Sequence, residues 1–589
     1  MHAMRSFRAV VTICLCLIAG SPAVWAVTRQ PVTAANGMVV TSQHEASAVG
    51  VEILRQGGNA IDAAVAVGYA LAVTNPCCGN IGGGGFATLH LADGRDIFLN
   101  FREKAPAAAT ETMYLDERGE VVPDLSLEGY LAVAVPGSVL GLDTLLRKYG
   151  TMDRAAVMAP AIKLAEDGFI LTQGDADILA TATGHFAGEG NVAAIFLNNR
   201  RPWKPGDRFV QKNLAATLKL IAQRGPEAFY KGSIADTIVA ASKANGGVLS
   251  DQDFENYSVT ESPPVRCNYR GYELISAPPP SSGGTAICEI LNILEGYPIA
   301  ELGFHSAAAI HLMVEAMRHT FVDRNFLLGD PAFVKNPVER LLSEAYAAEV
   351  RAKIDTEKAS GSKEVQPGIP PHENTETTHY SIVDAAGNAV SVTYTVNALF
   401  GAKVIAGDTG FFLNDEMDDF TVKPGVANLF GLVQGKTNAI APGKQPLSSM
   451  SPTLVTKDGK IFMVLGSPGG SRIITIAVQV IMNVVDHGMN IQEAVNAPRI
   501  HHQWLPDQIA VEPYALSPDT IKILTGMGHK IAEQSPWGAA EGILVGPEDA
   551  ANTTQPTSGN DAMAGRKPVP GLLYGGHDDR RPAGSAIGY

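Results

Sequence analysis

A long polar segment ends at Thr377, where a strong strand pattern begins. Residues 355–376 are rich in charge, include three prolines and contain almost no large apolar side chain. A segment of this composition cannot bury enough apolar surface to become ordered. We therefore predict a flexible, cuttable connection over residues 355–376 that joins two parts of a folded chain.

The chain after this connection has the pattern of a β-hairpin. Residues 378–383 and 389–396 alternate in period two around a turn at 384–388. Gly387 suits the left-handed position of a three-residue hairpin loop. The flexible segment therefore leads directly into a regular pair of strands.

The register of this hairpin brings two threonines together. Pairing of Asp384 with Asn388 also places Thr395 directly across from Thr377, close enough for contact between the two hydroxyl groups. A threonine that becomes a chain N-terminus carries an α-amine, and this amine can activate its own hydroxyl as a nucleophile. The junction thus predicts a chain that cuts itself before Thr377 to expose a catalytic N-terminal threonine.

Composition indicates a large folded protein and excludes one class of partner. The chain has 589 residues, of which 46% are hydrophobic and 18% charged, which suits two to four domains or one large layered α/β fold. The formal charge of −15 argues against nucleic acid, because phosphate binding calls for a basic surface. The acidity is the ordinary charge of a soluble protein.

The first 26 residues have the pattern of a secretory signal peptide. Arg5 and Arg8 precede an apolar run over residues 9–19, and small residues lead to Ala26. The apolar run is too short to span a bilayer. We expect cleavage after Ala26, export to the periplasm or the medium, and no membrane segment once the signal is removed.

Four cysteines remain after signal removal, and they leave the question of disulfides open. Cys77 and Cys78 are adjacent, whereas Cys267 and Cys288 lie 21 residues apart and can pair only if the fold brings them together. The chain contains no CxxC or HExxH spacing. We therefore expect neither a metal site nor a cofactor.

Periodicity and turn residues predict several elements near the glycine-rich motifs. We expect helices over residues 44–56, 60–73, 305–326 and 472–486. We expect strands over residues 86–91, 96–101 and 461–465. A polar, irregular insertion is expected over residues 549–571.

Two glycine-rich motifs receive different interpretations. The glycines at 82–85 follow a helix and lead into a strand, which is the reverse of a phosphate loop, so close backbone packing explains them better. The glycines at 466–471 follow a strand and open a helix. Free N–H groups at such a helix start suit a small anion, including the oxyanion of a reaction.

Eight motifs in a fixed order along the chain carry a family resemblance. They are residues 80–86 (NIGGGGF), 100–103 (NFRE), 278–284 (PPPSSGG), 377–381 (TTHYS), 414–420 (NDEMDDF), 446–452 (PLSSMSP), 466–473 (GSPGGSRI) and 588–589 (GY). In these motifs the chain resembles the γ-glutamyltranspeptidase (glutathione hydrolase) family of N-terminal-nucleophile hydrolases over essentially the whole mature chain. The resemblance implies an α+β fold, a four-layer αββα sandwich built jointly by two fragments of one precursor.

The resemblance also implies the products of cleavage and the reaction. Thr377 splits the precursor into a large subunit, 27–376, and a small catalytic subunit, 377–589, which stay together as a heterodimer. Thr377 then attacks a γ-glutamyl amide such as glutathione and forms an acyl-enzyme, which passes to water or to an amino-acid or dipeptide acceptor.

Roles for further residues follow from the same resemblance. The substrate carboxylate is assigned to Arg102 with the hydroxyl groups of Ser448 and Ser449. The substrate ammonium is assigned to Asn397, Glu416 and Asp419. Thr395 supports the nucleophile, and Gly469 and Gly470 donate N–H groups to the oxyanion.

Each of these residues also has a purely structural interpretation. Arg102 can form a plain ion pair, Asp419 can belong to a solvated acidic turn, and Ser448 and Ser449 can cap a backbone turn. Gly469 and Gly470 can serve packing alone. His501 and His502 are interpreted as structural, because adjacent residues point apart on a strand.

One departure from the family pattern affects the lid over the site. Phe430 stands where many bacterial members have a tyrosine that closes the lid over the substrate. Loss of that hydroxyl puts the lid hydrogen bond in doubt and affects acceptor preference.

Two alternative functions remain open. One is a cephalosporin (glutaryl) acylase of the same fold, which needs no ammonium site. The other is an exported solute-binding protein, which would not cleave itself.

Overall fold

The computed structural model describes residues 29–362, 377–546 and 568–589. The expected signal peptide at 1–26, most of the connection before Thr377 and most of the insertion at 549–571 lie outside the described residues. Within the described part of the chain, no helix is long and apolar enough to cross a membrane.

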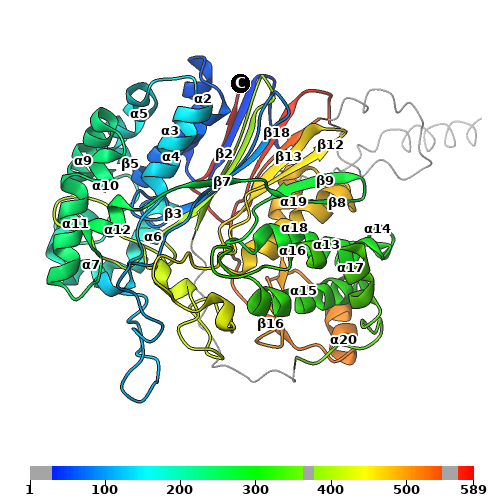
Figure 1. Ribbon diagram of the computed structural model, residues 1–589. Helices are drawn as coiled ribbons and strands as arrows, with labels where there is room; N and C mark the ends of the chain where they lie inside the picture. Colours follow the sequence, from blue (N-terminus) through cyan, green and yellow to red (C-terminus); the bar gives the residue numbers. More distant parts are fainter. Residues whose placement is uncertain (1–28, 363–376, 547–567) are drawn as a thin grey trace, which may run out of the picture.

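Two seven-stranded antiparallel sheets stack face to face at the centre of the molecule (Figure 1). The first sheet has the order β1 (Val32–Ala34), β18 (Leu573–His577), β17 (Glu541–Val545), β13 (Lys460–Gly466), β12 (Thr453–Lys457), β9 (Tyr272–Ser276) and β8 (Val265–Tyr269). The second sheet has the order β19 (Ser585–Gly588), β2 (Gly37–Thr41), β10 (Thr378–Asp384), β11 (Ala389–Thr395), β3 (Gly84–His90), β4 (Asp96–Phe101) and β7 (Thr260–Ser262). Buried apolar side chains such as Val40, Val383 and Val464 fill the space between the sheets.

Helices cover the outer face of each sheet, and Figure 1 shows them on opposite sides of the molecule. The second sheet is covered by α2 (His44–Arg55), α3 (Ala60–Thr74) and α4 (Ser138–Tyr149). The first sheet is covered by α13 (Gly283–Glu295), α18 (Arg472–Val485) and α19 (Ile491–Asn496), with α15 (Ala307–Leu327) packed on α13. This arrangement confirms the predicted four-layer αββα sandwich.

The elements with the strongest sequence patterns appear where they were expected. All side chains of α3 are buried, and the helix begins with a capping box in which Asn59 accepts from two backbone N–H groups. Strand β4 has the predicted ends. Strand β3 begins two residues earlier than predicted, because Gly84 and Gly85 already pair with β11.

The hairpin that follows Thr377 has the predicted register. Thr378 pairs with Tyr394, the pairing runs without a break to Val383 and Ala389, and the Asp384 N–H donates to the carbonyl of Asn388. On its other edge β10 pairs with β2. Thr377 therefore stands at the start of a strand that is held on both sides.

The described residues contain two disulfides, and both involve cysteines of the predicted mature chain. Cys267 on β8 is bonded to Cys288 on α13, with 5.8 Å between their Cα atoms. This bond attaches a covering helix to the edge of the first sheet. The second disulfide joins the adjacent residues Cys77 and Cys78.

Residues 355–362 lie against α15. His311 is bonded through Nε2 to the carbonyl of Asp355 at 2.7 Å, and the Ser360 N–H donates to Glu315 at 3.1 Å. Ser362 is buried. The prediction of a flexible connection from residue 355 onward was therefore wrong for residues 355–362, because polar side chains of the folded core order them in place of apolar burial.

Candidate active site

Thr377 is buried and lines two neighbouring cavities. The first, which we call the arginine cavity, has about 300 Å³ of empty space and is also lined by Arg102, Arg324, Thr395, Asn397, Asp419, Phe430, Ser448, Ser449 and Gly470. The second, of about 330 Å³, is lined by Ser42, Gln43, Asn75, Cys78, Pro468 and Arg581. The arginine cavity therefore brings a threonine hydroxyl, two guanidinium groups and a carboxyl group to one place.

The hairpin and the loop after it place Thr395 and Asn397 in the same cavity as Thr377. The Asn397 N–H donates to the Thr395 hydroxyl at 2.8 Å, and the Asn397 side chain donates to the carbonyl of Asp415 at 3.1 Å. Asn397 has a φ of 78°, a conformation that asparagine tolerates better than most residues. A Cβ atom on Gly83 would lie 1.9 Å from the carbonyl oxygen of Thr395, so close backbone packing is the role of this glycine.

Arg102 leaves the end of β4 and is fully buried beneath the cavity. Its guanidinium contacts Glu416 at 2.6 Å, forms a second ion pair with Asp419 and lies 3.4 Å from Glu103. The residue predicted to bind a carboxylate thus contacts two of the residues predicted to bind an ammonium ion. The ion pair of the structural interpretation and the residues of the predicted binding site therefore belong to one cluster.

Carboxyl groups outnumber guanidinium groups in this cluster. Burial raises the pKa of Glu416 well above its ordinary value, and the Arg102 charge opposes this shift. Burial likewise raises the pKa of Glu103 to about 7 and that of Asp418 to about 6. Among the described residues, Oε1 of Glu416 has no hydrogen-bond partner. The cluster is therefore suited to receive a further cation.

Arg324 is a second buried guanidinium in the arginine cavity, and the sequence analysis missed it. It donates to the Ser449 hydroxyl at 3.1 Å and to Gln434 at 3.0 Å. Within the described ranges it forms no ion pair, and burial lowers its pKa to about 10. An arginine near the end of a helix is ordinarily a surface residue, so no local pattern indicated this role.

The loop between β13 and α18 brings Gly470 to the arginine cavity, with Gly469 next to it. Gly470 has a φ of 54°, and a Cβ atom on it would lie 2.4 Å from the Phe430 ring. Phe430 is buried, and its carbonyl accepts from Gln503 at 3.0 Å. The Leu429 N–H donates to Asp418 at 2.9 Å. Ring packing and backbone hydrogen bonds thus hold this segment over the cavity without a tyrosine hydroxyl.

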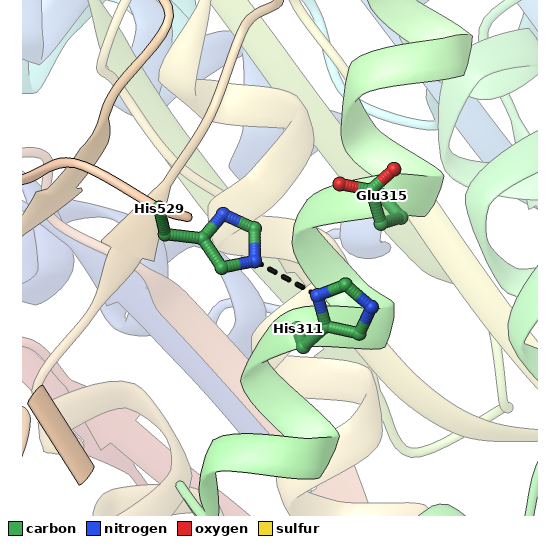
Figure 2. A group of neighbouring side chains, drawn as sticks. All are labelled: His311, Glu315 and His529. Atoms are coloured by element: carbon green, nitrogen blue, oxygen red, sulfur yellow. Dashed lines mark hydrogen bonds between the residues drawn. The ribbon is translucent and has the colours of Figure 1, made fainter. Parts of the chain in front are cut away.

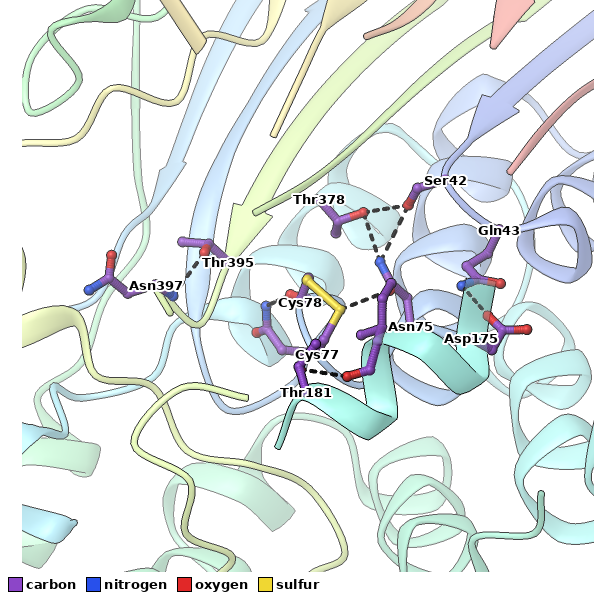
Figure 3. Close-up of a disulfide and its surroundings, with 12 residues drawn as sticks. Ser42, Gln43, Asn75, Cys77, Cys78, Asp175, Thr181, Thr378, Thr395 and Asn397 are labelled. Atoms are coloured by element: carbon purple, nitrogen blue, oxygen red, sulfur yellow. Dashed lines mark hydrogen bonds between the residues drawn. A yellow bond between two sulfur atoms is a disulfide. The ribbon is translucent and has the colours of Figure 1, made fainter. Parts of the chain in front are cut away.

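A disulfide lies on the other side of the hairpin from Thr395 (Figure 3). Cys78 lines the second cavity together with Thr377. The Asn75 side chain donates to the hydroxyl of Thr378 at 3.2 Å and to that of Ser42 at 3.3 Å. These contacts fix the backbone at the start of β10 and, with it, the position of Thr377.

His501 and His502, the adjacent histidines interpreted as structural, are buried in the core. His501 is hydrogen bonded to Thr475 and to Gln503, each at 2.9 Å, and burial holds its pKa well below the ordinary value. His502 is bonded through Nδ1 to the N–H of Trp504 at 3.1 Å. Both rings are occupied by structural contacts.

A family model described as gamma-glutamyltranspeptidase matches residues 46–565. The chain belongs to the gamma-glutamyltranspeptidase family. It is 57% identical to a glutathione hydrolase proenzyme of Pseudomonas sp. (strain A14) over 96% of each chain. It is 49% identical to the glutathione hydrolase proenzyme of Escherichia coli (strain K12), over 91% of this chain and 93% of the relative. Among solved structures, it resembles a cephalosporin acylase from Bacillus halodurans with a TM-score of 0.79 and 29% identity, over 97% of this chain and 99% of the other.

Residues of five motifs that lie far apart in the sequence line the arginine cavity together with Thr395 and Asn397. The cavity lining includes Arg102, Thr395, Asn397, Asp419, Ser448, Ser449 and Gly470. Two predicted site residues do not line the cavity: Glu416 lies behind Arg102, which it contacts, and Gly469 precedes the lining residue Gly470. Arg324 and Cys78 are additions that the motifs did not contain.

Substitution Gly470→Ala is expected to reduce turnover by about 10- to 100-fold. An L-residue in this conformation costs about 1–2 kcal/mol, and the added methyl group displaces the Phe430 ring. Steady-state kinetics with a γ-glutamyl substrate measure the effect. Gly459→Ala is a matched control, because Gly459 also has a positive φ of 75° but no atom within 4 Å of the added Cβ.

The cause of the loss can be separated with a double variant. Gly470→Ala combined with Phe430→Ala removes the clash but keeps the backbone strain. Partial recovery of turnover is expected. A double variant no better than Gly470→Ala would show that the ring contact is not what limits turnover.

Proposed function

We propose that this protein is a self-cleaving γ-glutamyltransferase and glutathione hydrolase whose nucleophile is Thr377. The observation that supports it most strongly is the arginine cavity, in which a threonine after the connection shares one space with two buried guanidinium groups and a buried acidic cluster. Two relatives that are 57% and 49% identical to this chain over more than nine-tenths of its length are named glutathione hydrolase proenzymes.

The first reaction is cleavage of the precursor. The Thr377 hydroxyl attacks the carbonyl carbon of residue 376, the C–N bond breaks, and an ester links residue 376 to Oγ of Thr377. Water then hydrolyses this ester. The products are a large subunit, 27–376, and a small subunit, 377–589, with a free α-amine on Thr377.

The second reaction is acyl transfer. The α-amine takes the proton of the Thr377 hydroxyl as Oγ attacks the γ-carbonyl carbon of the substrate, and N–H groups of Gly469 and Gly470 stabilise the oxyanion. The amine of the leaving group takes the proton as the amide C–N bond breaks. Water releases glutamate from the acyl-enzyme, or an amino acid or dipeptide amine accepts the acyl group. Thr395 positions the nucleophile across the hairpin.

The α-carboxylate and the α-ammonium group of the glutamyl substrate each face side chains of opposite charge in this proposal. Arg102, with Ser448 and Ser449, binds the α-carboxylate. Arg324 donates to Ser449 and adds a second positive charge on that side. The ammonium group is bound by Asn397, Glu416 and Asp419, and the excess of carboxyl groups in this cluster favours it.

A cephalosporin (glutaryl) acylase is the second candidate, and the similarity to the Bacillus halodurans acylase structure favours it. A glutaryl group differs from a γ-glutamyl group only by the missing ammonium. The buried acidic cluster is a feature that a glutaryl substrate does not need. We therefore place the glutamyl substrate first.

The substitution Glu416→Gln tests this choice. We measure kcat/KM for γ-glutamyl-p-nitroanilide and glutaryl-p-nitroanilide. The wild-type protein is expected to prefer the glutamyl compound by at least about 100-fold, and Glu416→Gln to narrow that preference by about 10-fold or more, because a charge-assisted contact is lost. Glu117→Gln, at an exposed position, is the control. A wild-type preference for the glutaryl compound would instead make the protein an acylase.

We place the processed enzyme in the periplasm of a Gram-negative cell, because the first 26 residues have the pattern of a cleavable signal. Release of the activity by osmotic shock is the expected result. Activity that stays with spheroplasts would contradict this location.

A further inference from the structure

A second cluster of metal-ligating side chains lies in the helical layer beside α15 (Figure 2). His311 and Glu315 stand one turn apart on α15, and His529 lies in the chain between α20 (Pro518–Gly526) and β16 (Ile531–Glu533). All three are buried, and their ligand atoms lie within 4.8 Å of one another. The two cavities that Thr377 lines contain none of them.

The two histidines share one hydrogen bond through their facing nitrogens. Nδ1 of His311 lies 2.8 Å from Nε2 of His529. The other nitrogen of His311, Nε2, donates to the carbonyl of Asp355 at 2.7 Å, so its Nδ1 carries the lone pair. A backbone carbonyl that holds the far N–H of a histidine is the usual support of a metal ligand.

Glu315 has one carboxylate oxygen in use and one without a partner. Its Oε1 accepts from the Ser360 N–H at 3.1 Å and lies 3.4 Å from Nε of Arg318. Its Oε2 is buried and, among the described residues, has no hydrogen-bond partner. A buried anionic oxygen that no protein group satisfies is costly unless a cation binds it.

We propose that Nδ1 of His311, Oε2 of Glu315 and Nε2 of His529 bind a divalent transition-metal ion of the zinc type. Two imidazoles and one carboxylate are a ligand set that zinc prefers in proteins. A tetrahedral ion would separate its ligand atoms by about 3.3 Å, so small side-chain rotations convert the present arrangement. The proton on His529 Nε2 moves to Nδ1 of the same ring, which frees the Nε2 lone pair, and water completes the coordination.

The neighbouring charges are compatible with this ion. Arg318 is the cation nearest to Glu315, and it is also paired with Asp507, which lies 3.5 Å from His502. Arg318 therefore satisfies Asp507 and one oxygen of Glu315, while the other oxygen remains for the ion.

The site would join parts of the chain that lie on either side of the cleavage position. His311 and Glu315 precede Thr377, and His529 follows it. His311 and Glu315 also form hydrogen bonds with Asp355 and Ser360, a few residues before the end of the described range 29–362. The role of the ion rests on the proposed cleavage. In the cleaved protein the ion connects the large subunit to the small subunit, and it does not take part in the chemistry of Thr377.

The experiment is a metal titration of the purified protein after removal of bound ions with a chelator. We expect one Co²⁺ per chain with the visible absorption of a tetrahedral site, and its displacement by one equivalent of Zn²⁺. Saturation with Zn²⁺ is expected to raise the melting temperature. His311→Gln and His529→Gln are each expected to weaken binding by at least about 100-fold and to remove the shift in melting temperature.

His487→Gln is the control, because His487 is half-buried in the same layer but outside the cluster. It should bind Co²⁺ like the wild type. A wild-type protein with no saturable tetrahedral Co²⁺ site would overturn the proposal, as would unchanged binding in both histidine variants. If a variant does not fold, the X-ray absorption spectrum of the zinc-loaded wild type decides, since two imidazole ligands are required.

This test is independent of the proposed catalytic function. A chain that binds one metal ion but remains uncut would refute self-cleavage and leave the site intact. A chain that is cut and active but binds no ion would refute the site alone.

Discussion

Thr377→Ala is expected to leave the precursor in one piece and to abolish γ-glutamyl hydrolysis. The substitution removes the oxygen that attacks both the peptide bond before residue 377 and the substrate. A denaturing gel of the wild-type protein should show two fragments, 27–376 and 377–589, and the variant should show one chain. Activity should fall by at least about 10⁴-fold, as expected when a nucleophile is removed.

Two further variants separate chemistry from folding. Thr377→Ser keeps a hydroxyl and an α-amine, so slower but complete cleavage is expected. Thr520→Ala changes a half-buried threonine in the first turn of α20, far along the chain from Thr377, and should behave like the wild type. A Thr377→Ala chain that still yields the same two fragments would exclude Thr377 as the agent of cleavage.

Substitution of Arg102 is expected to have the second largest effect. Arg102→Lys keeps a positive charge but loses the paired N–H groups that bind a carboxylate, so KM should rise by about 100-fold. Self-cleavage should continue, because Arg102 does not touch the cut bond in the proposed mechanism. Steady-state kinetics and a denaturing gel measure the two effects separately.

Arg102→Gln should also destabilise the fold in a pH-dependent way. It leaves Glu103, Glu416 and Asp419 buried without their main cation, at a cost of about 3–5 kcal/mol. Burial already raises the pKa of these carboxyl groups, and loss of Arg102 raises it further. A folded-state pKa above the unfolded value makes stability fall as pH rises. The loss measured by denaturant unfolding should therefore be larger at pH 8 than at pH 5, and a loss that grows toward pH 5 would contradict this origin.

The sequence alone predicted those features that depend on local pattern. The all-apolar face of α3, the alternation in β10 and β11, and the turn at Gly387 each specify one local structure, and the hairpin register follows from the turn. The position of Thr395 across from Thr377 could therefore be predicted before any tertiary contact was known.

The features that the sequence did not predict depend on contacts between distant residues. Nothing near Arg102 shows that its partners are Glu416 and Asp419, more than 300 residues later. Arg324 becomes a cavity residue only because α15 packs on α13. The order in residues 355–362 likewise comes from side chains of α15 and from Asp507. Asp507 accepts from the Ser362 N–H at 3.0 Å, and Arg318 on α15 donates to the Ser362 hydroxyl.

The strand order of the two sheets determines what happens to the protein after it has been cut. Strands β10 and β11 lie between β2 and β3, so strands from after Thr377 are inserted among strands from before it. In the cleaved enzyme, neither fragment could leave without opening the hydrogen-bond ladders on both edges of this strand pair. A fragment alone would expose unpaired strand edges, which favour aggregation. The lifetime of the mature enzyme is therefore expected to depend on a slow rate of unfolding. Once the two fragments have unfolded, they are expected to aggregate and not to refold.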